Sequence, residues 1–320
     1  MNTPSHEQLS QLVAHAVYRE FPEAVAEGAT PVENARVVLE GAAERLAALV
    51  AGWLRVGFCQ GNFNSDNCLV GGRTMDYGPF GWMDVYDPMF AKWVGSGQHF
   101  AFLNQPDATL ANYQTLAESL MPLLGDDAKK EVKEAVRDAA DKIGAAVDAM
   151  WREKLGFKAS AGEGTVMALW DELEPLMRQS QIDWTLFWRQ LAVVAELDPA
   201  AAADAEAVMA PLADAFYGEL PAALVVKWAE WLRKYHQTLG ADGPRAEAAI
   251  RMRSVNPKYV PREWMLVEAY DLAAEGDYSL VIELNTLFKQ PYAEQPDMEA
   301  KYYRRAPDAA LTSAGTAFMS

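Results

Sequence analysis

Residues 57–78 read Gly-Phe-Cys-Gln-Gly-Asn-Phe-Asn-Ser-Asp-Asn-Cys-Leu-Val-Gly-Gly-Arg-Thr-Met-Asp-Tyr-Gly and interrupt a chain whose pattern is otherwise mostly helical. In this stretch glycines, asparagines and short β-prone pieces replace the helical period, which is typical of a functional loop. The Gly71-Gly72 pair separates two short runs, 68–70 and 73–75. It predicts a two-residue hairpin, because glycine accepts the positive φ that such turns require.

A symmetric register about this turn places Asn67 opposite Asp76 and Cys68 opposite Met75, with Asp66 beside the first pair. Directly opposed residues have Cβ atoms roughly 5 Å apart. An amide oxygen and a carboxylate at that separation suit Mg²⁺ or Mn²⁺ bridging to phosphate oxygens. The alternative is that Asn67 and Asp76 only close a hairpin with polar ends.

The same stretch resembles the catalytic loop of protein kinases and the Asp-Phe-Gly triplet that follows it, in which an Asn and the Asp hold metal ions. Asp76 begins the equivalent triplet, and Asn67 takes the place of the metal-binding Asn. The alignment puts Gln60 where kinases have His and Asn62 where they have the catalytic Asp. Since an amide does not accept a proton as a carboxylate does, the ordinary kinase base is missing, and the nearest carboxylate is Asp66.

This displaced arrangement resembles the selenoprotein O (YdiU-type) family of protein adenylyltransferases. That family has a pseudokinase-like fold and a loop of the type His-Gly-x-x-Asn-Thr-Asp-Asn, followed by Asp-Tyr-Gly-Pro-Phe-Gly. Residues 60–67 and 76–81 fill those positions. The resemblance continues in order through residues 84–88, 102–106, 183–187, 256–262 and 290–292. An ordered series over most of the chain makes chance a poor explanation.

The resemblance implies a protein adenylyltransferase that moves AMP from ATP to Ser, Thr or Tyr hydroxyls of proteins. It makes Asp66 the proton acceptor, Asn67 and Asp76 the ligands of Mg²⁺ or Mn²⁺, and Asp76 also a contact to the nucleotide through the metal. Two alternatives stay open: a kinase-like γ-phosphoryl transferase, and a catalytically silent pseudokinase-type binding module.

The sequence departs from the family pattern in three places. The family's N-terminal lobe has a glycine-rich segment and a lysine paired to a glutamate, whereas the first lysine here is Lys92, after the loop. We therefore expect a truncated chain that is weak or inactive alone, or one that works with a separately encoded N-lobe. Gln60 replaces the loop histidine. The terminal residues 314–320 contain neither cysteine nor selenocysteine, which puts redox control at that end in doubt.

Outside the loop the patterns predict helices. Thr30-Pro31-Val32-Glu33 is a capping box with proline at the first helical position, and predicts a helix over 31–54. Apolar periodicity predicts one long amphipathic helix over about 132–150 and further helices over 165–177 and 184–195. The expected fold is mainly α: a protein-kinase-like (pseudokinase) C-lobe core over residues 1–125, with a short β-hairpin at the catalytic loop, and a helical C-terminal extension over 126–320.

Composition and charge disfavour some classes of binding partner and some cellular compartments for this chain. A formal charge of −17 and a pI near 4.7 disfavour nucleic acid as a partner. Neither a membrane span nor a secretory signal is visible in the sequence. Cys59 and Cys68 are the only cysteines and are interpreted as ordinary thiols. By family resemblance the compartment is the cytoplasm for a bacterial chain and the mitochondrion for a eukaryotic one.

Several other aromatic, acidic and arginine residues are interpreted as stabilising the fold and not as binding a ligand. Trp184, Phe187 and Trp188 have helical spacing and are expected in the core. Asp84 and Asp87 are expected to make turns and hydrogen bonds rather than to bind metal. For Arg251, Arg253 and Arg262, we favour structural or surface pairing over phosphate binding.

Overall fold

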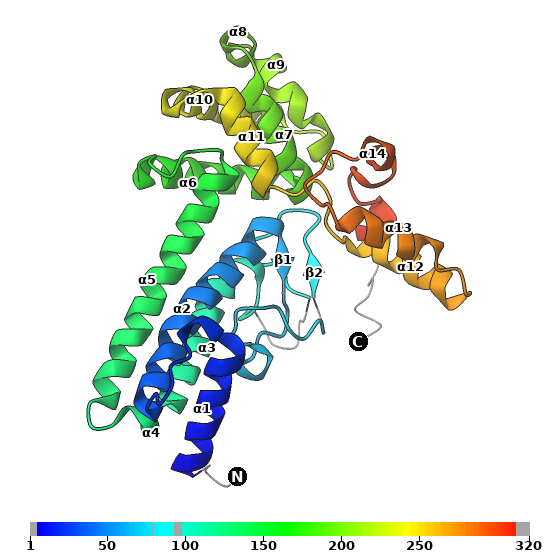
Figure 1. The fold of residues 1–320 in the computed structure, drawn as a ribbon. Coiled ribbons are helices and arrows are strands. Elements are labelled where there is room, and N and C mark those ends of the chain that lie inside the picture. The colour runs from blue at the N-terminus through cyan, green and yellow to red at the C-terminus, as the bar shows by residue number, and fades with distance from the viewer. Residues whose placement is uncertain (1–4, 79, 93–97, 312–320) are drawn as a thin grey trace.

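The computed structural model describes residues 5–78, 80–92 and 98–311 and is mainly helical, with one small two-stranded antiparallel sheet in this described part (Figure 1). In chain order its α-helices and strands are α1 (His6–Glu20), α2 (Pro31–Val56), β1 (Phe58–Cys59), β2 (Gly81–Trp82), α3 (Gln105–Ser119), α4 (Met121–Leu124), α5 (Ala128–Lys154), α6 (Glu163–Ser180), α7 (Trp184–Glu196), α8 (Pro199–Ala203), α9 (Ala205–Met209), α10 (Ala222–Asp242), α11 (Arg245–Val255), α12 (Glu263–Ala274), α13 (Ser279–Phe288), α14 (Pro296–Tyr302) and α15 (Asp308–Leu311). None of the helices in the described ranges is long and apolar enough to cross a lipid bilayer.

The N-terminal part is built around α2, which confirms the helix predicted over 31–54. The Thr30 side chain accepts a hydrogen bond from the Glu33 backbone N–H, and the Glu33 carboxylate accepts one from the Thr30 N–H, so the predicted capping box forms. The helix ends at Gly57, whose φ of 73° is left-handed and suits glycine. In Figure 1, α2 lies beside α5, and α3 packs against both.

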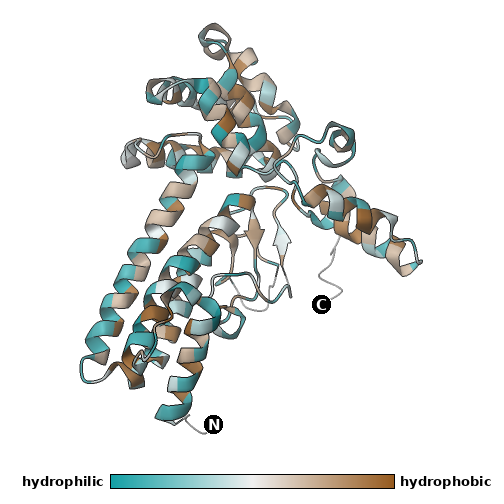
Figure 2. Ribbon diagram, viewed as in Figure 1, coloured by the Kyte–Doolittle hydropathy of each residue, from teal (hydrophilic) through white to brown (hydrophobic). Residues whose placement is uncertain are grey.

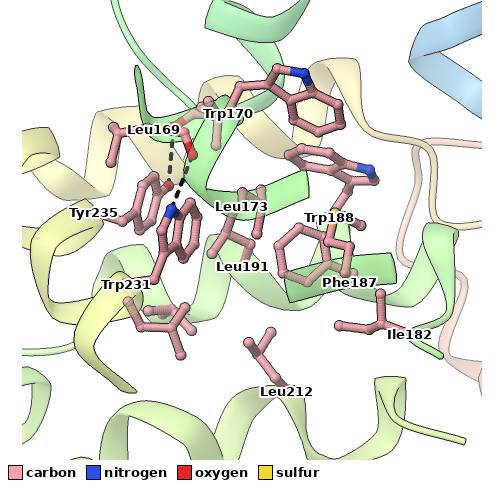
Figure 3. Packing of buried hydrophobic residues seen from close by; sticks show 14 of the residues in the cluster. Leu169, Trp170, Leu173, Ile182, Phe187, Trp188, Leu191, Leu212, Trp231 and Tyr235 are labelled. Carbon is pink, nitrogen blue, oxygen red and sulfur yellow. Dashed lines mark hydrogen bonds between the residues drawn. The ribbon is translucent and has the colours of Figure 1, made fainter. Parts of the chain in front are cut away.

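The long amphipathic helix is confirmed as α5, which Figure 2 shows to be largely hydrophilic with apolar residues at intervals. It leads into a second, larger core formed by α6, α7, α10 and α11. The helices predicted over 165–177 and 184–195 are α6 and α7. Figure 3 shows Trp188 and Phe187 of α7 packed among leucines and Trp170 of α6, while Trp231 of α10 donates to the Leu169 carbonyl. Trp184, Phe187 and Trp188 are all buried, as predicted.

The predicted hairpin is wrong in its register. The two-stranded sheet lies at the ends of the loop, where Phe58 pairs with Trp82 and Cys59 with Gly81. Within the loop Cys68 bridges to Thr74, one residue short of the predicted Met75.

The turn geometry explains the shifted register. The Gly72 N–H donates to the Leu69 carbonyl at 2.9 Å, so the turn is centred one residue earlier than the Gly71-Gly72 pair. Of the two glycines only Gly72 has a positive φ, 66°. A β-turn followed by a left-handed glycine is a different hairpin from the two-residue type, whose I′ form needs positive φ at both central residues and whose II′ form needs it at the first. A Cβ on Gly72 would lie 2.6 Å from the Arg45 carbonyl oxygen of α2, so contact with the helix also favours glycine there.

Candidate functional site

The loop between β1 and β2 rests on a small aromatic core. Trp53 of α2 meets Phe63 edge-on at 4.8 Å between ring centroids and lies 5.5 Å from Phe58. The Trp53 indole N–H also donates to the Thr74 hydroxyl oxygen at 2.9 Å. One helical side chain thus contacts the first arm of the loop by packing and the second arm by a hydrogen bond, which holds both arms against α2.

Gln60 is the centre of the polar network above this core and is 1% exposed. Its side-chain Nε2 donates to the Asp76 carbonyl at 3.0 Å and approaches the Met75 carbonyl at 3.5 Å. Its Oε1 accepts from the Asn62 backbone N–H at 2.9 Å. Gln60, which stands where the family pattern has histidine, therefore ties the first arm of the loop to the residue that begins the Asp-Tyr-Gly triplet.

Two buried amides of α3 hold the loop from the other side. Gln105 accepts from the Gln60 N–H at 3.1 Å and donates to the Phe58 carbonyl at 2.9 Å. Asn112 donates to the Phe63 carbonyl at 2.8 Å. These bonds satisfy backbone groups of β1 and of the loop after it, and an unpaired buried group costs roughly 1–3 kcal/mol.

Asn62 contacts both of the predicted metal ligands. The Asn67 side-chain amide donates to the Asn62 carbonyl at 2.8 Å, and the Asn62 side-chain amide approaches Asp76 Oδ2 at 3.5 Å. The structure therefore places Asn67 and Asp76 around one residue, although the hairpin register from which we derived their proximity is wrong. Because Asn67 uses its N–H group for this bond, its side-chain oxygen remains available as an acceptor or ligand.

Asp76 has an unusual backbone conformation for a non-glycine residue, with φ at 54°. Aspartate tolerates this region better than most residues because its short side chain can bond locally. Here Asp76 Oδ1 accepts from the Gly78 N–H at 3.1 Å, and the Asp76 carbonyl accepts from Gln60. The surrounding bonds thus compensate the backbone strain and fix the direction of the carboxylate.

The donors fit a hard cation only in part. The described residues contain no group of three or more His, Cys, Asp or Glu side chains that could hold a metal ion. The Asn67 amide oxygen and the Asp76 carboxylate are nevertheless ligands of the kind that Mg²⁺ and Mn²⁺ prefer, and Mg²⁺ sites commonly use one or two carboxylates completed by water and substrate phosphates. An ion on these two donors would need further oxygens from water or a nucleotide to complete its shell.

Asp66 lies on the short 3₁₀ turn Ser65–Asn67, directly before Asn67, and is exposed. Its carboxylate has no hydrogen-bond or ion-pair partner within the described part of the chain. A free carboxylate beside the Asn67 and Asp76 pair can accept a proton from an incoming hydroxyl group. The family resemblance implies this role for Asp66.

The tip of the loop is fixed to α1 by a charged contact. Glu20 at the end of α1 is 4% exposed and pairs with Arg73 at 2.6 Å and with Arg19 at 3.2 Å. A Cβ on Gly71 would lie 2.1 Å from the Glu20 carboxylate, so a larger residue there would displace this side chain. The first helix of the chain thus contributes to the shape of the segment between Asn67 and Asp76.

The remaining acids and arginines have structural partners, as we interpreted them. Arg262 is buried and makes a two-bond ion pair with Asp183 at 2.6 and 2.9 Å, and it lies 3.3 Å from Asp84. Burial raises the pKa of Asp84 to about 6, against the opposing pull of the Arg262 charge. Arg253 pairs with Glu196, Arg251 donates to the Gly156 carbonyl, and Asp87 accepts from the Met89 N–H in a turn.

Sequence reasoning missed the supporting residues Gln105, Asn112 and Glu20. Gln105 lay in a segment noted only for its family resemblance, and Asn112 and Glu20 occupy positions that a helical pattern treats as ordinary. A polar residue on the buried face of a helix was the one available signal, because such a residue needs a partner. The pattern does not say which backbone group that partner is.

Comparison with known proteins gives consistent matches. A family model described as protein adenylyltransferase SelO matches residues 2–289. Protein nucleotidyltransferase YdiU of Aromatoleum aromaticum is 34% identical over 321 residues, which cover 98% of this chain and 57% of that protein. The proteins of the same name from Flavobacterium johnsoniae and Azoarcus sp. are 32% and 34% identical, with 98% of this chain and 58% of each relative covered. The chain therefore spans a little under three fifths of the length of these curated relatives.

Proposed function

Because the chain belongs to the SelO family of protein adenylyltransferases, we propose that it takes part in transferring AMP from ATP to Ser, Thr or Tyr hydroxyls of proteins. The observation that carries this proposal is the arrangement around Asn62. There the Asn67 side chain donates to the Asn62 carbonyl, and the Asn62 side chain approaches Asp76. The free Asp66 carboxylate directly precedes Asn67 on the same turn. The names of the relatives support nucleotidyl transfer, and the protein acceptor is part of the proposal.

In the proposed reaction Asp66 accepts the proton of the acceptor hydroxyl. The hydroxyl oxygen forms a bond to the α-phosphorus of ATP, the bond from that phosphorus to the bridging oxygen of the β-phosphate breaks, and pyrophosphate leaves. Asn67 and Asp76 would hold Mg²⁺ or Mn²⁺, which when bound neutralises charge on the leaving pyrophosphate. The loop's own contribution is positioning, since Gln60 and Asn62 fix Asp76 before the nucleotide arrives.

Asn62 disfavours the kinase alternative. It occupies the place of the kinase base, carries an amide that does not accept a proton, and uses its side chain to approach Asp76 and to bond with Asn64. Transfer of the γ-phosphoryl group would therefore lack a carboxylate at the usual position. No comparable observation favours a silent binding module.

We retain as proposals the kinase-like C-lobe, with its core in residues 1–125 and a helical extension in 126–320, and a cooperating N-lobe that supplies phosphate-binding groups. The described helices support a largely α-helical core, and α5 begins at Ala128, close to the proposed boundary. The relatives are bacterial proteins, which supports a cytoplasmic site of action for a bacterial chain.

The test joins this chain to the portion of a full-length relative that it does not match, and follows label from ATP into protein. We expect label from the α-phosphate and none from the γ-phosphate. Asp66→Ala should slow transfer by on the order of 10²-fold or more, the usual scale for a lost general base. Asp141→Ala, which removes an exposed carboxylate on α5, is the matched control and should leave the rate unchanged. Transfer of the γ-label would overturn the proposal.

A binding measurement on the chain alone separates the metal site from catalysis. Calorimetry with Mn²⁺ and ATP should show weak binding that requires both components, because the two protein oxygens do not complete a coordination shell. Asp76→Ala should abolish that binding. Identical isotherms for the two proteins would count against the proposed ligands.

A further inference from the structure

An open cavity of about 690 Å³ lies beside the Asp66 turn, between the loop, residues 98–100 and the first turns of α3. Ser65, the residue directly before Asp66, is part of its wall. An occupant of this cavity would therefore lie beside the turn that carries Asp66, the residue to which we assign the hydroxyl proton.

Two amide side chains, Asn104 and Asn112, form part of the polar wall. Asn112 donates its side-chain N–H to the Phe63 carbonyl, and Asn104 donates its own to the Gln98 carbonyl, both at 2.8 Å. Each amide thus uses one N–H group on the backbone, and no bond to its side-chain oxygen is found among the described residues. Both amides line the cavity, so each can offer an acceptor to an occupant.

The charged group on the wall is negative. Asp107, in the first turn of α3, is exposed and has no ion-pair partner among the described residues. The described wall contains no lysine or arginine, and His99 at its edge is its basic residue. The half-buried Phe100 adds an aromatic surface, which attracts a cation electrostatically. Acceptors, a carboxylate and an aromatic ring form the environment that a guanidinium or ammonium group requires.

We propose that this cavity binds an arginine or lysine side chain of the acceptor protein, close to the hydroxyl that is modified. The inference rests on the proposed function, because that function makes Asp66 the place where the hydroxyl arrives. The net charge of −17 favours the approach of a basic segment over long range. The cavity then selects the segment by its cationic side chain.

The test measures peptide binding to the chain without nucleotide, at about 0.15 M ionic strength, where the Debye length is about 8 Å and long-range attraction is screened. The probes are two short fluorescein-labelled peptides, one with a serine flanked by arginines and one with glutamines in their place. By fluorescence anisotropy we expect the arginine peptide to bind at least about tenfold more tightly, as for a charge-assisted contact. Asp107→Asn should remove most of that preference.

The matched control is Asp271→Asn, which removes one exposed carboxylate on α12 and should leave the preference within about twofold. Circular dichroism establishes that both variants fold. Equal binding of the two peptides, no binding of either, or the same loss in both variants would overturn the inference. Because this measurement uses no ATP, its failure is distinguishable from a failure of AMP transfer, which the α-label experiment detects.

Discussion

The loop of residues 57–82 and the bundle of α6, α7, α10 and α11 are maintained by different interactions. The bundle is an apolar core in which almost every residue of α7 is buried. The loop has two-residue strands and depends on amide side chains that bond to backbone carbonyls. Hydrophobic packing tolerates changes in detail if volume is conserved, whereas a hydrogen-bonded loop requires particular atoms. The comparison predicts that mutations in the bundle reduce stability, and that mutations in the loop reduce ligand binding more than stability.

The largest expected loss of stability is that of Trp188→Ala. Trp188 is 1% exposed, meets Trp184 and Phe187 edge-on, and has the Lys154 side-chain nitrogen 4.2 Å from its ring centroid. Truncation of a buried tryptophan leaves a large cavity and typically costs about 3–5 kcal/mol. Urea unfolding should show a decrease of this size in the free energy of unfolding.

The control for this change is Val193→Ala on the same helix, where the valine is 43% exposed. It removes apolar atoms without opening a core cavity, so its effect should stay within about 0.5 kcal/mol. Comparable losses in both variants would show that α7 is stabilised by something other than its buried face.

The junction of the two regions should show a smaller, pH-dependent effect. Asp84 follows β2, its carbonyl accepts from the Trp184 N–H at the start of α7, and its carboxylate lies near Arg262. Its pKa is about 6 in the folded chain, against about 3.9 for an unperturbed aspartate. A group that binds its proton more tightly when folded adds stability at low pH. That contribution is lost as the pH rises to about 6.

We therefore expect the free energy of unfolding of the native chain, relative to Asp84→Asn, to fall between about pH 4 and pH 6 and to level off above. The shift of about two pKa units corresponds to roughly 3 kcal/mol at most. Denaturant unfolding of both proteins at several pH values measures the difference. Curves that stay parallel over this range would mean that Asp84 is not protonated in the folded chain.

The sequence predicted the helical part well because one physical signal governs it. Apolar periodicity located α2, α5, α6 and α7, and the Thr30 capping box located the start of α2. Buried tryptophans such as Trp188 followed from the same spacing. The residues that fill a helix core are determined locally, so a single sequence is sufficient to identify them.

The loop was predicted only in outline. Motif spacing selected Asn67 and Asp76, each of which contacts Asn62, but the Gly71-Gly72 turn was misplaced by one residue. The true turn depends on contact with α1 and α2, which local sequence does not encode. The bond from Gln60 to Asp76 likewise joins residues sixteen positions apart through a side-chain conformation that no periodicity indicates.

The smallest expected loss of stability, and the sharpest test of the comparison, is Gln60→Ala. The change removes the donor to the Asp76 carbonyl and the acceptor of the Asn62 N–H, which should cost about 1–2 kcal/mol in the free energy of unfolding. Without that donor the left-handed backbone of Asp76 loses a bond that compensates its strain, so the carboxylate is no longer fixed for a metal. The affinity for ATP with Mn²⁺ should therefore fall by roughly tenfold or more, as one such bond allows.

The control for both measurements is Gln114→Ala, which removes an exposed glutamine of α3 that bonds to Glu118. This change should alter neither the free energy of unfolding nor the nucleotide affinity. If Gln60→Ala lost stability but kept its nucleotide affinity, the amide network would be a structural support alone, and the loop would resemble the bundle after all.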